Sequence, residues 1–196
     1  KLLTFWATLP GLHYRNKGER VVRIATFLLA FAGVSTFSGS VAAAPIYYDC
    51  DTAPDKFSEV KWPITSSGLV VTGKIVPVLF RKGQFLPVAN LHLRSGDGKN
   101  NLAIRLSAES SGSKSASISL ELVNNAQKKG GALGQLKRSE VLPFSITHTA
   151  GHQFTIMIND RKFDVELTLD DNSTLSMTCS TGQFQFQDVD TNSATR

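Results

Sequence analysis

The sequence lacks an apolar run long enough to cross a membrane as a helix. Its longest uncharged apolar stretch, Ile24–Phe37, has fourteen residues and is interrupted by Gly33 and Ser35. A membrane-spanning helix needs about 20 apolar residues. We therefore interpret this stretch as part of an export signal, with a membrane anchor as the alternative.

The residues on either side of this stretch favour the export signal. Basic residues between Arg15 and Arg23 precede it, and small residues over Ser38–Ala44 follow it. A charged region, a short apolar region and a small-residue end are the three parts of a secretory signal. We predict a signal peptide over residues 1–44 that is cleaved near Ala44, and one secreted domain over residues 45–196. Residues 1–14 are assigned no structure, because they can derive from an extended gene model.

The predicted domain has almost no net charge. Five of the 21 basic residues and one of the 16 acidic residues precede Pro45, which leaves 16 bases against 15 acids. The basic isoelectric point therefore comes mostly from the leader. A domain this close to neutral has no electrostatic attraction to nucleic acid or to anionic lipid, so both are excluded as partners.

Cysteine is scarce, and both cysteines, Cys50 and Cys179, lie in the predicted domain. In an oxidising compartment such a pair is expected to be bridged, although two unpaired buried thiols remain the alternative. A bridge would close a loop of about 130 residues and stabilise the fold by about 4–5 kcal/mol. The sequon at Asn172 predicts a glycosylation site in a polar turn.

The sequence also lacks apolar residues at helical spacing over any length that would form an ordinary helix. From Gly68 onward, short runs alternate between apolar and polar residues and are separated by turn signals every eight to twelve positions, a pattern typical of a β-sandwich or jelly roll. The predicted strands are Leu69–Phe80, Phe85–Leu93, Asn101–Ala108, Ser117–Val123, Phe154–Ile158, Lys162–Leu169, Thr174–Cys179 and Gln183–Val189. The predicted turns are Arg81–Gly83, Ser95–Gly98, Lys128–Gly131 and Asn159–Arg161.

The alternation assigns a face to each strand residue. Ile104, Leu106 and Ala108 are predicted to point inward, as are Ile118, Leu120 and Leu122 on the next strand. The outward positions of these two strands are Arg105, Ser107, Glu109, Ser119, Glu121, Val123 and Asn125. An outward polar face can recognise a carbohydrate or a protein, but any antiparallel sheet exposes such a face.

Catalytic and metal-binding patterns are sparse. A glycosidase needs two carboxylates facing each other across a cleft, and Glu109 and Glu121 carry no further acidic residues along one strand. His148 and His152 fall in a predicted turn without a neighbouring cysteine or carboxylate ligand, which argues against a metal. His92 on a strand is interpreted as a packed or surface histidine. We predict neither an enzyme nor a cofactor or metal.

The region Leu69–Val189 resembles the galectin carbohydrate-recognition domain. Gly68–Gly98 resembles the opening strands of that family, and Phe154–Asp160 resembles a later strand that begins with phenylalanine. Asn101–Glu109 and Gly130–Phe144 occupy the places of the two segments that carry the family's sugar ligands, and Thr174–Val189 resembles the closing pair of strands. The resemblance implies a concanavalin-like jelly-roll β-sandwich of two antiparallel sheets.

In galectins, a β-galactoside is held by polar side chains and stacks on a tryptophan. Arg105, Ser107 and Glu109 stand where the family has histidine, asparagine and arginine. The later family asparagine is matched by Asn125, with Asn124 as the alternative. The remaining ligand positions are Leu133 in place of the tryptophan, Leu136 in place of a glutamate, and the retained arginine Arg138.

These replacements imply altered sugar recognition. Leucine offers no aromatic face to galactose, and it cannot accept a hydrogen bond from a sugar hydroxyl. The first hypothesis is therefore a secreted lectin of changed specificity, whose partners are extracellular glycans, galactosides among them, or glycoproteins. The second is a domain of the same fold that binds protein. The third, an enzyme acting on polysaccharide, is disfavoured because paired carboxylates are missing.

Overall fold

The structure, a computed structural model, describes residues 44–191. The predicted leader, residues 1–44, lies outside this range except for Ala44. Within residues 44–191, every regular element is a β-strand, and no helix is long and apolar enough to cross a membrane. The strands are β1 (Ile46–Asp51), β2 (Phe57–Pro63), β3 (Val70–Phe80), β4 (Val88–Arg94), β5 (Asn101–Ser107), β6 (Ser115–Asn124), β7 (Gln127–Lys137), β8 (Leu142–Ala150), β9 (Gln153–Ile158), β10 (Arg161–Glu166), β11 (Thr174–Ser180) and β12 (Gly182–Thr191).

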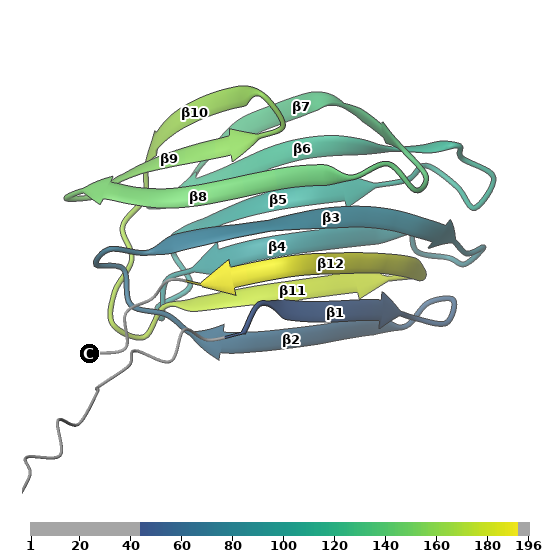
Figure 1. The fold of residues 1–196 in the computed structure, drawn as a ribbon, viewed down its shortest axis with the longest axis horizontal. Helices are drawn as coiled ribbons and strands as arrows, with labels where there is room; N and C mark the ends of the chain where they lie inside the picture. The colour runs from purple at the N-terminus through teal and green to yellow at the C-terminus, as the bar shows by residue number, and fades with distance from the viewer. Residues whose placement is uncertain (1–43, 192–196) are drawn as a thin grey trace, which may run out of the picture. The chain divides into compact units, whose positions relative to one another are not determined.

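The strands form two antiparallel sheets of six strands each (Figure 1). Sheet A has the order β1-β12-β3-β8-β9-β10, and sheet B has the order β2-β11-β4-β5-β6-β7. The two sheets pack face to face, with β1 and β2 along one side of the sandwich and β10 and β7 along the other (Figure 1). The predicted jelly-roll β-sandwich of two antiparallel sheets is confirmed.

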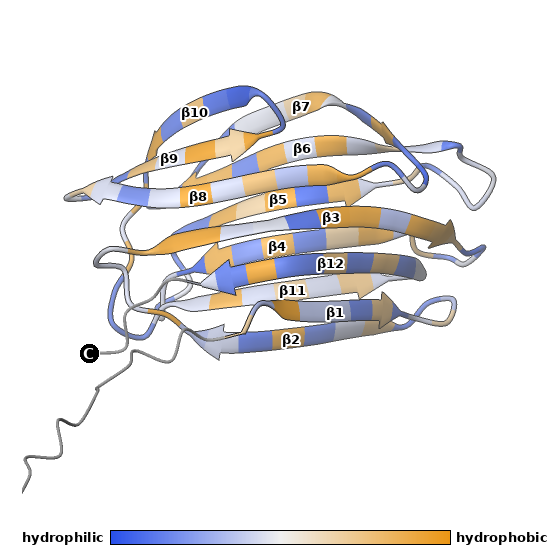
Figure 2. Ribbon diagram, viewed as in Figure 1, coloured by the Kyte–Doolittle hydropathy of each residue, from blue (hydrophilic) through white to orange (hydrophobic). Residues whose placement is uncertain are grey.

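The core lies between the sheets and follows from the alternation of side chains along each strand. On β6, Ala116, Ile118, Leu120 and Leu122 are buried, while the residues between them are only half-buried. Figure 2 shows hydrophobic and hydrophilic residues following one another along several strands, β4 and β5 among them. Phenylalanines from sheet A fill the centre, and Phe154, Phe184 and Phe186 are among the largest fully buried side chains. The inward positions predicted for β5 and β6 are all buried.

Four strands, β1, β2, β7 and β8, were not predicted from the sequence. The predicted turn Lys128–Gly131 lies within β7, because the chain reverses two residues earlier, at Asn125 and Ala126. Both of these residues have positive φ angles, 48° and 65°, as the turn of a tight hairpin requires. His148, also predicted in a turn, lies on β8, where its ring packs 5.0 Å from the ring of Phe154.

A disulfide joins Cys50 on β1 to Cys179 on β11. Because β1 belongs to sheet A and β11 to sheet B, the predicted bridge ties the two sheets together along one side of the sandwich. Both cysteines are buried. The described residues contain no free cysteine.

Candidate functional site

Two of the six predicted sugar-binding residues lie on the outer face of sheet B, the face turned away from the core. Arg105 and Ser107 point outward on β5, in the middle of the sheet. Glu109 follows the end of β5 in an exposed connection. These three residues share the parity that the sequence predicted, but only the first two are held in the sheet.

The other three predicted residues lie elsewhere. Asn125 occupies the β6–β7 turn, where its backbone N–H donates to Asn100 Oδ1 at 2.9 Å. Leu133 is half-buried on β7 and packs against the core, and Arg138 is exposed just after β7. Leu136, matched to the family's glutamate, is buried and faces inward. The structure therefore does not bring the six residues together into one site.

On one side, the neighbours of Arg105 on the outer face come from β4, which the sequence-based site did not include. Asn90, His92 and Arg94 alternate along β4 with the buried residues Leu91 and Leu93. Their period-two spacing places all three side chains on the outer face. This alternation of three polar residues with leucines was the signal in the sequence that could have identified the strand.

The register of the strands sets two polar rows across sheet B. Asn90 stands between Thr178 on β11 and Arg105 on β5, and its Nδ2 donates to Thr178 Oγ1 at 3.2 Å. His92 stands between Ser176 and Ala103 in the next row. Ala103 is small and only 3% exposed, so larger side chains around it cover it, and one more residue stands beyond it in that row.

That residue is Glu121 on β6, which forms the charged border of the face. One of its carboxylate oxygens lies 3.2 Å from Lys128 Nζ, and the other lies 3.9 Å from Arg105 Nη1. The other acid of this face, Glu59, is on β2 beside Thr178. Both signs of charge therefore occur on the face, together with amide, hydroxyl and imidazole groups.

A hollow of about 330 Å³ opens on this face over β2, β11 and β4. Phe57 stands at its rim and is 78% exposed, although it belongs to a strand. Asn90 and His92 line its floor side by side with Arg94. The remaining lining residues are Glu59, Val88, Thr178, Cys179 and Ser180.

Burial lowers the pKa of His92 below its ordinary value, and the positive charges of Arg94 and Arg105 lower it further. Glu121 and Glu59 oppose this shift without reversing it. The imidazole is therefore neutral at neutral pH, with one ring nitrogen able to donate a hydrogen bond and the other able to accept one.

The groups around the hollow suit hydrogen-bonding recognition better than metal chemistry. Among the described residues, no group of three or more histidine, cysteine, aspartate or glutamate side chains is placed to hold a metal ion. The hollow instead combines an exposed aromatic ring with donors and acceptors of several kinds. Such a mixture can bind a ligand that has both C–H faces and hydroxyl groups.

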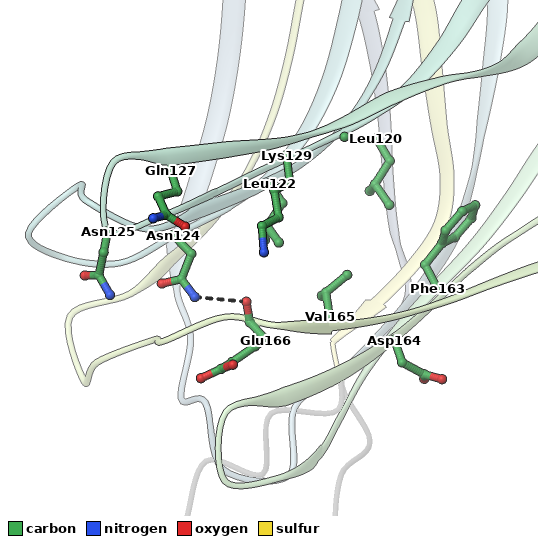
Figure 3. A pocket seen from close by; sticks show the side chains of 11 residues that line it. Leu120, Leu122, Asn124, Asn125, Gln127, Lys129, Phe163, Asp164, Val165 and Glu166 are labelled. Carbon is green, nitrogen blue, oxygen red and sulfur yellow. Dashed lines mark hydrogen bonds between the residues drawn. The ribbon is translucent and has the colours of Figure 1, made fainter.

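A second and larger cleft, of about 710 Å³, lies where the sandwich opens between the edge strands β7 and β10 (Figure 3). Leu120, Leu122, Phe163 and Val165 supply its apolar lining, and Asn125 belongs to its wall. Two hydrogen bonds join its two sides. Arg161 Nη1 donates to the Leu133 carbonyl at 2.6 Å, and Asn124 Nδ2 donates to the Glu166 carbonyl at 3.2 Å.

The predicted glycosylation site lies six residues before Thr178, in the connection that leads into β11. Asn172 is exposed in the connection between β10 and β11, where its backbone N–H donates to Asp170 Oδ1 at 2.9 Å. Its position in a surface turn is the one that the sequence predicted. Its modification stays a prediction.

No protein-family model matches the chain, and no curated protein matches its sequence. Solved structures do resemble it. An alginate lyase from Alteromonas sp. 272 superposes with a TM-score of 0.55 at 8% identity, over 78% of this chain and 89% of the lyase. A lyase of polysaccharide lyase family 18 gives 0.54 at 8% identity, with the same coverage of both chains. A galectin from Caenorhabditis elegans gives 0.46 at 11% identity, over 74% of this chain and 95% of the galectin.

The two lyases share the fold of this chain, and identities this low show nothing beyond the fold. The galectin's TM-score is too low to support even that conclusion. Activity and ligand therefore have to be argued from the residues of this chain.

Proposed function

We propose that the protein is a secreted glycan-binding protein that recognises its ligand in the hollow on the outer face of sheet B. The observation that carries this proposal is the combination of Phe57 with Asn90, His92 and Arg94 around one hollow. A sugar ring presents a C–H face to an aromatic side chain and hydroxyl groups to polar side chains, and this hollow offers partners for both.

Phe57 supplies the aromatic surface that Leu133 does not. A phenylalanine left 78% exposed on a strand keeps its apolar area in water, and covering that area with the C–H face of a sugar is favourable. The loss of the family's tryptophan is thus no obstacle to stacking, because the ring comes from another strand.

The polar side chains of the hollow match sugar hydroxyls. A hydroxyl both donates and accepts, and the neutral imidazole of His92 and the amide of Asn90 can each do the same. The guanidinium of Arg94 adds donors at the edge. Because Arg105 and Ser107 extend this face across β5, they remain part of the proposed binding surface.

The shared fold agrees with a polysaccharide as the ligand. The lyases named above are enzymes that act on polysaccharide, one of them on alginate. We carry over only the class of ligand, since their identity to this chain is 8%. An extracellular location follows from the predicted leader and is supported by the disulfide, because disulfides persist in oxidising compartments.

We further propose that binding is not followed by glycoside hydrolysis. Glu59 on β2 and Glu121 on β6 are separated by four strand spacings in sheet B, which is about 19 Å at 4.8 Å per spacing. Glycosidases place their two carboxylates about 5–9.5 Å apart. The two acids of this face are therefore too far apart to act on one bond.

The test is an array of neutral and acidic glycans and polysaccharides, alginate and β-1,4-galactan among them, probed with the disulfide-bonded protein. The Asn90→Ala plus His92→Ala double variant is expected to lose binding. The matched control, His152→Ala plus Gln153→Ala, removes the same kinds of side chain from exposed positions at the β8–β9 turn and the start of β9, in the other sheet, and is expected to bind as the wild type does.

Three results would contradict the proposal. If the folded wild type binds no glycan on the array, the interpretation shifts to the recognition of protein. Equal binding by the double variant would place the site elsewhere. Release of reducing ends, or of an unsaturated product absorbing in the ultraviolet, from any bound polysaccharide would show an enzyme.

A further inference from the structure

The end of the sandwich next to the hollow exposes three large apolar side chains. Phe57 is 78% exposed, Phe85 is 64% exposed and Leu86 is 48% exposed. They come from two chain segments, the start of β2 and the connection between β3 and β4, which lie at the same end of the molecule (Figure 1). We call these three residues the apolar platform.

The platform is a built feature, because hydrogen bonds fix the β3–β4 connection against its neighbours. The carboxylate of Asp55, two residues before Phe57, accepts the backbone N–H groups of Gln84 at 2.6 Å and Phe85 at 2.9 Å. The backbone N–H of Asp55 in turn donates to Thr181 Oγ1 at 3.2 Å. The position of Phe85 is thus fixed by hydrogen bonds among three connections, those between β1 and β2, between β3 and β4, and between β11 and β12.

The platform is continuous with the hollow. Phe57 belongs to both, and Ser180, which also lines the hollow, lies beside Phe57 in the register of β2 and β11. The Ser180 hydroxyl donates to the Leu86 carbonyl at 3.3 Å. A ligand leaving the hollow over Phe57 therefore meets Leu86 and Phe85 next.

From this geometry we infer that the ligand is an extended polysaccharide chain rather than a single terminal sugar. The inference rests on the proposed function and adds a second subsite to it. The hollow, at about 330 Å³, is near the lower limit of small-ligand pockets, about 300 Å³, and holds about one sugar. The following sugars of the same chain pass over Phe57 and place their C–H faces on Phe85 and Leu86.

The polar hollow beside the platform favours a polysaccharide over a membrane surface. Lys56 and Lys82 are exposed beside the platform, and an anionic bilayer attracts basic residues, so charge does not separate these two partners. The hollow does, because three apolar side chains next to hydrogen-bonding groups suit a chain that is apolar on its ring faces and polar at its edges.

The experiment measures affinity against chain length by calorimetry, with dimers, tetramers and hexamers of alginate and of β-1,4-galactan as probes. For the wild type we expect the hexamer of one series to bind at least about tenfold more tightly than its dimer. Phe85→Ala is expected to weaken hexamer binding about fivefold, the effect of losing one stacking contact, and to leave dimer binding unchanged. Tyr47→Ala, which removes an exposed ring from β1 in sheet A, is the matched control and should change neither.

The outcomes separate this inference from the proposed function. If the dimer and hexamer bind equally, or if Phe85→Ala leaves hexamer affinity intact while Asn90→Ala plus His92→Ala abolishes it, the second subsite is refuted and the lectin site stands. If no member of either series binds, the inference is overturned, and a silent array then overturns the proposed function as well. Binding to phosphatidylcholine–phosphatidylglycerol vesicles that Phe85→Ala abolishes would assign the platform to a membrane instead.

Discussion

His92 is the titratable side chain of the hollow whose environment disfavours its charged form. Burial is the main cause of its lowered pKa, followed by the charge of Arg94. In the unfolded chain a histidine titrates near pH 6.5. Just below that pH, the unfolded state therefore binds more protons at this position than the folded state, and the free energy of unfolding falls as the pH falls.

We predict that this part of the pH dependence disappears in the His92→Gln variant. Urea denaturation at a series of pH values between about 7 and 5 measures the slope of the unfolding free energy. His152→Gln, a change at an exposed turn position, is the control. A wild-type slope retained in His92→Gln would contradict the neutral imidazole on which the proposed sugar contacts depend.

The carboxylates with lowered pKa values do not interfere with that measurement. Hydrogen bonds hold the pKa of Asp97, Asp164 and Asp170 below the usual value, chiefly from Ser95, Thr155 and the Gly96 backbone N–H respectively. Their contribution to stability is present above about pH 4 and is lost only as the pH falls through the lowered folded values. The pH range in which these carboxylates affect stability therefore lies below the range in which His92 does.

Within β7, Gly130 stands where the backbone comes too close to β6 for a side chain. Gly130 has a φ of 132°, and a Cβ added there would lie 2.1 Å from the Leu120 carbonyl oxygen on β6. We predict that Gly130→Ala lowers the free energy of unfolding by about 1–3 kcal/mol through backbone strain and displacement of β6. Chemical denaturation measures the change.

The neighbouring glycine is the matched control for this prediction. A Cβ at Gly131 would meet nothing within 4 Å, and its φ lies outside the positive region. Gly131→Ala is expected to change stability by less than about 0.5 kcal/mol. If both variants unfold at the wild-type denaturant concentration, the described pairing of β6 with β7 is incorrect.

Two strands, β5 and β6, were predicted together with their faces because their alternation is complete. In β5 and β6, buried leucines and isoleucines alternate with polar residues, and the sequence alone identified both strands and their faces. In β7, all but two residues are exposed, because this edge strand covers little of the core. Without buried apolar residues it carries no periodic signal, and its Lys128–Gly131 segment has the composition of a turn.

The site was less predictable than the fold, because it depends on register between distant strands. Glu59, Asn90 and Thr178 become neighbours only when β2 and β4 pair with β11, although Asn90 and Thr178 are 88 residues apart in the sequence. The resemblance to galectins instead directed attention along the chain, from Arg105 towards Arg138. Local alternation can place a side chain on a face, but it cannot say which strand lies alongside.

Across the whole molecule, the two sheets are held together differently at their two sides. At the β7–β10 side, the cleft is crossed by the hydrogen bonds from Arg161 to Leu133 and from Asn124 to Glu166. At the β1–β2 side, the Cys50–Cys179 disulfide joins the sheets covalently across a sequence separation of 129 residues. The hollow and the apolar platform lie on the covalently closed side, since Cys179 itself lines the hollow.

We therefore predict that loss of the disulfide weakens both the fold and ligand binding. Cys50→Ser plus Cys179→Ser frees a loop of this length in the unfolded chain, which should lower the free energy of unfolding by about 2–5 kcal/mol. Guanidinium denaturation of the variant, beside wild type with and without reductant, measures this loss. Reduced wild type should match the variant, because neither retains the cross-link. Glycan binding should fall with it, since Ser180, the residue after Cys179, contacts Leu86 of the platform. If the variant unfolds at the wild-type midpoint, the bridge is dispensable and the noncovalent packing of β1 against β11 suffices to close this side.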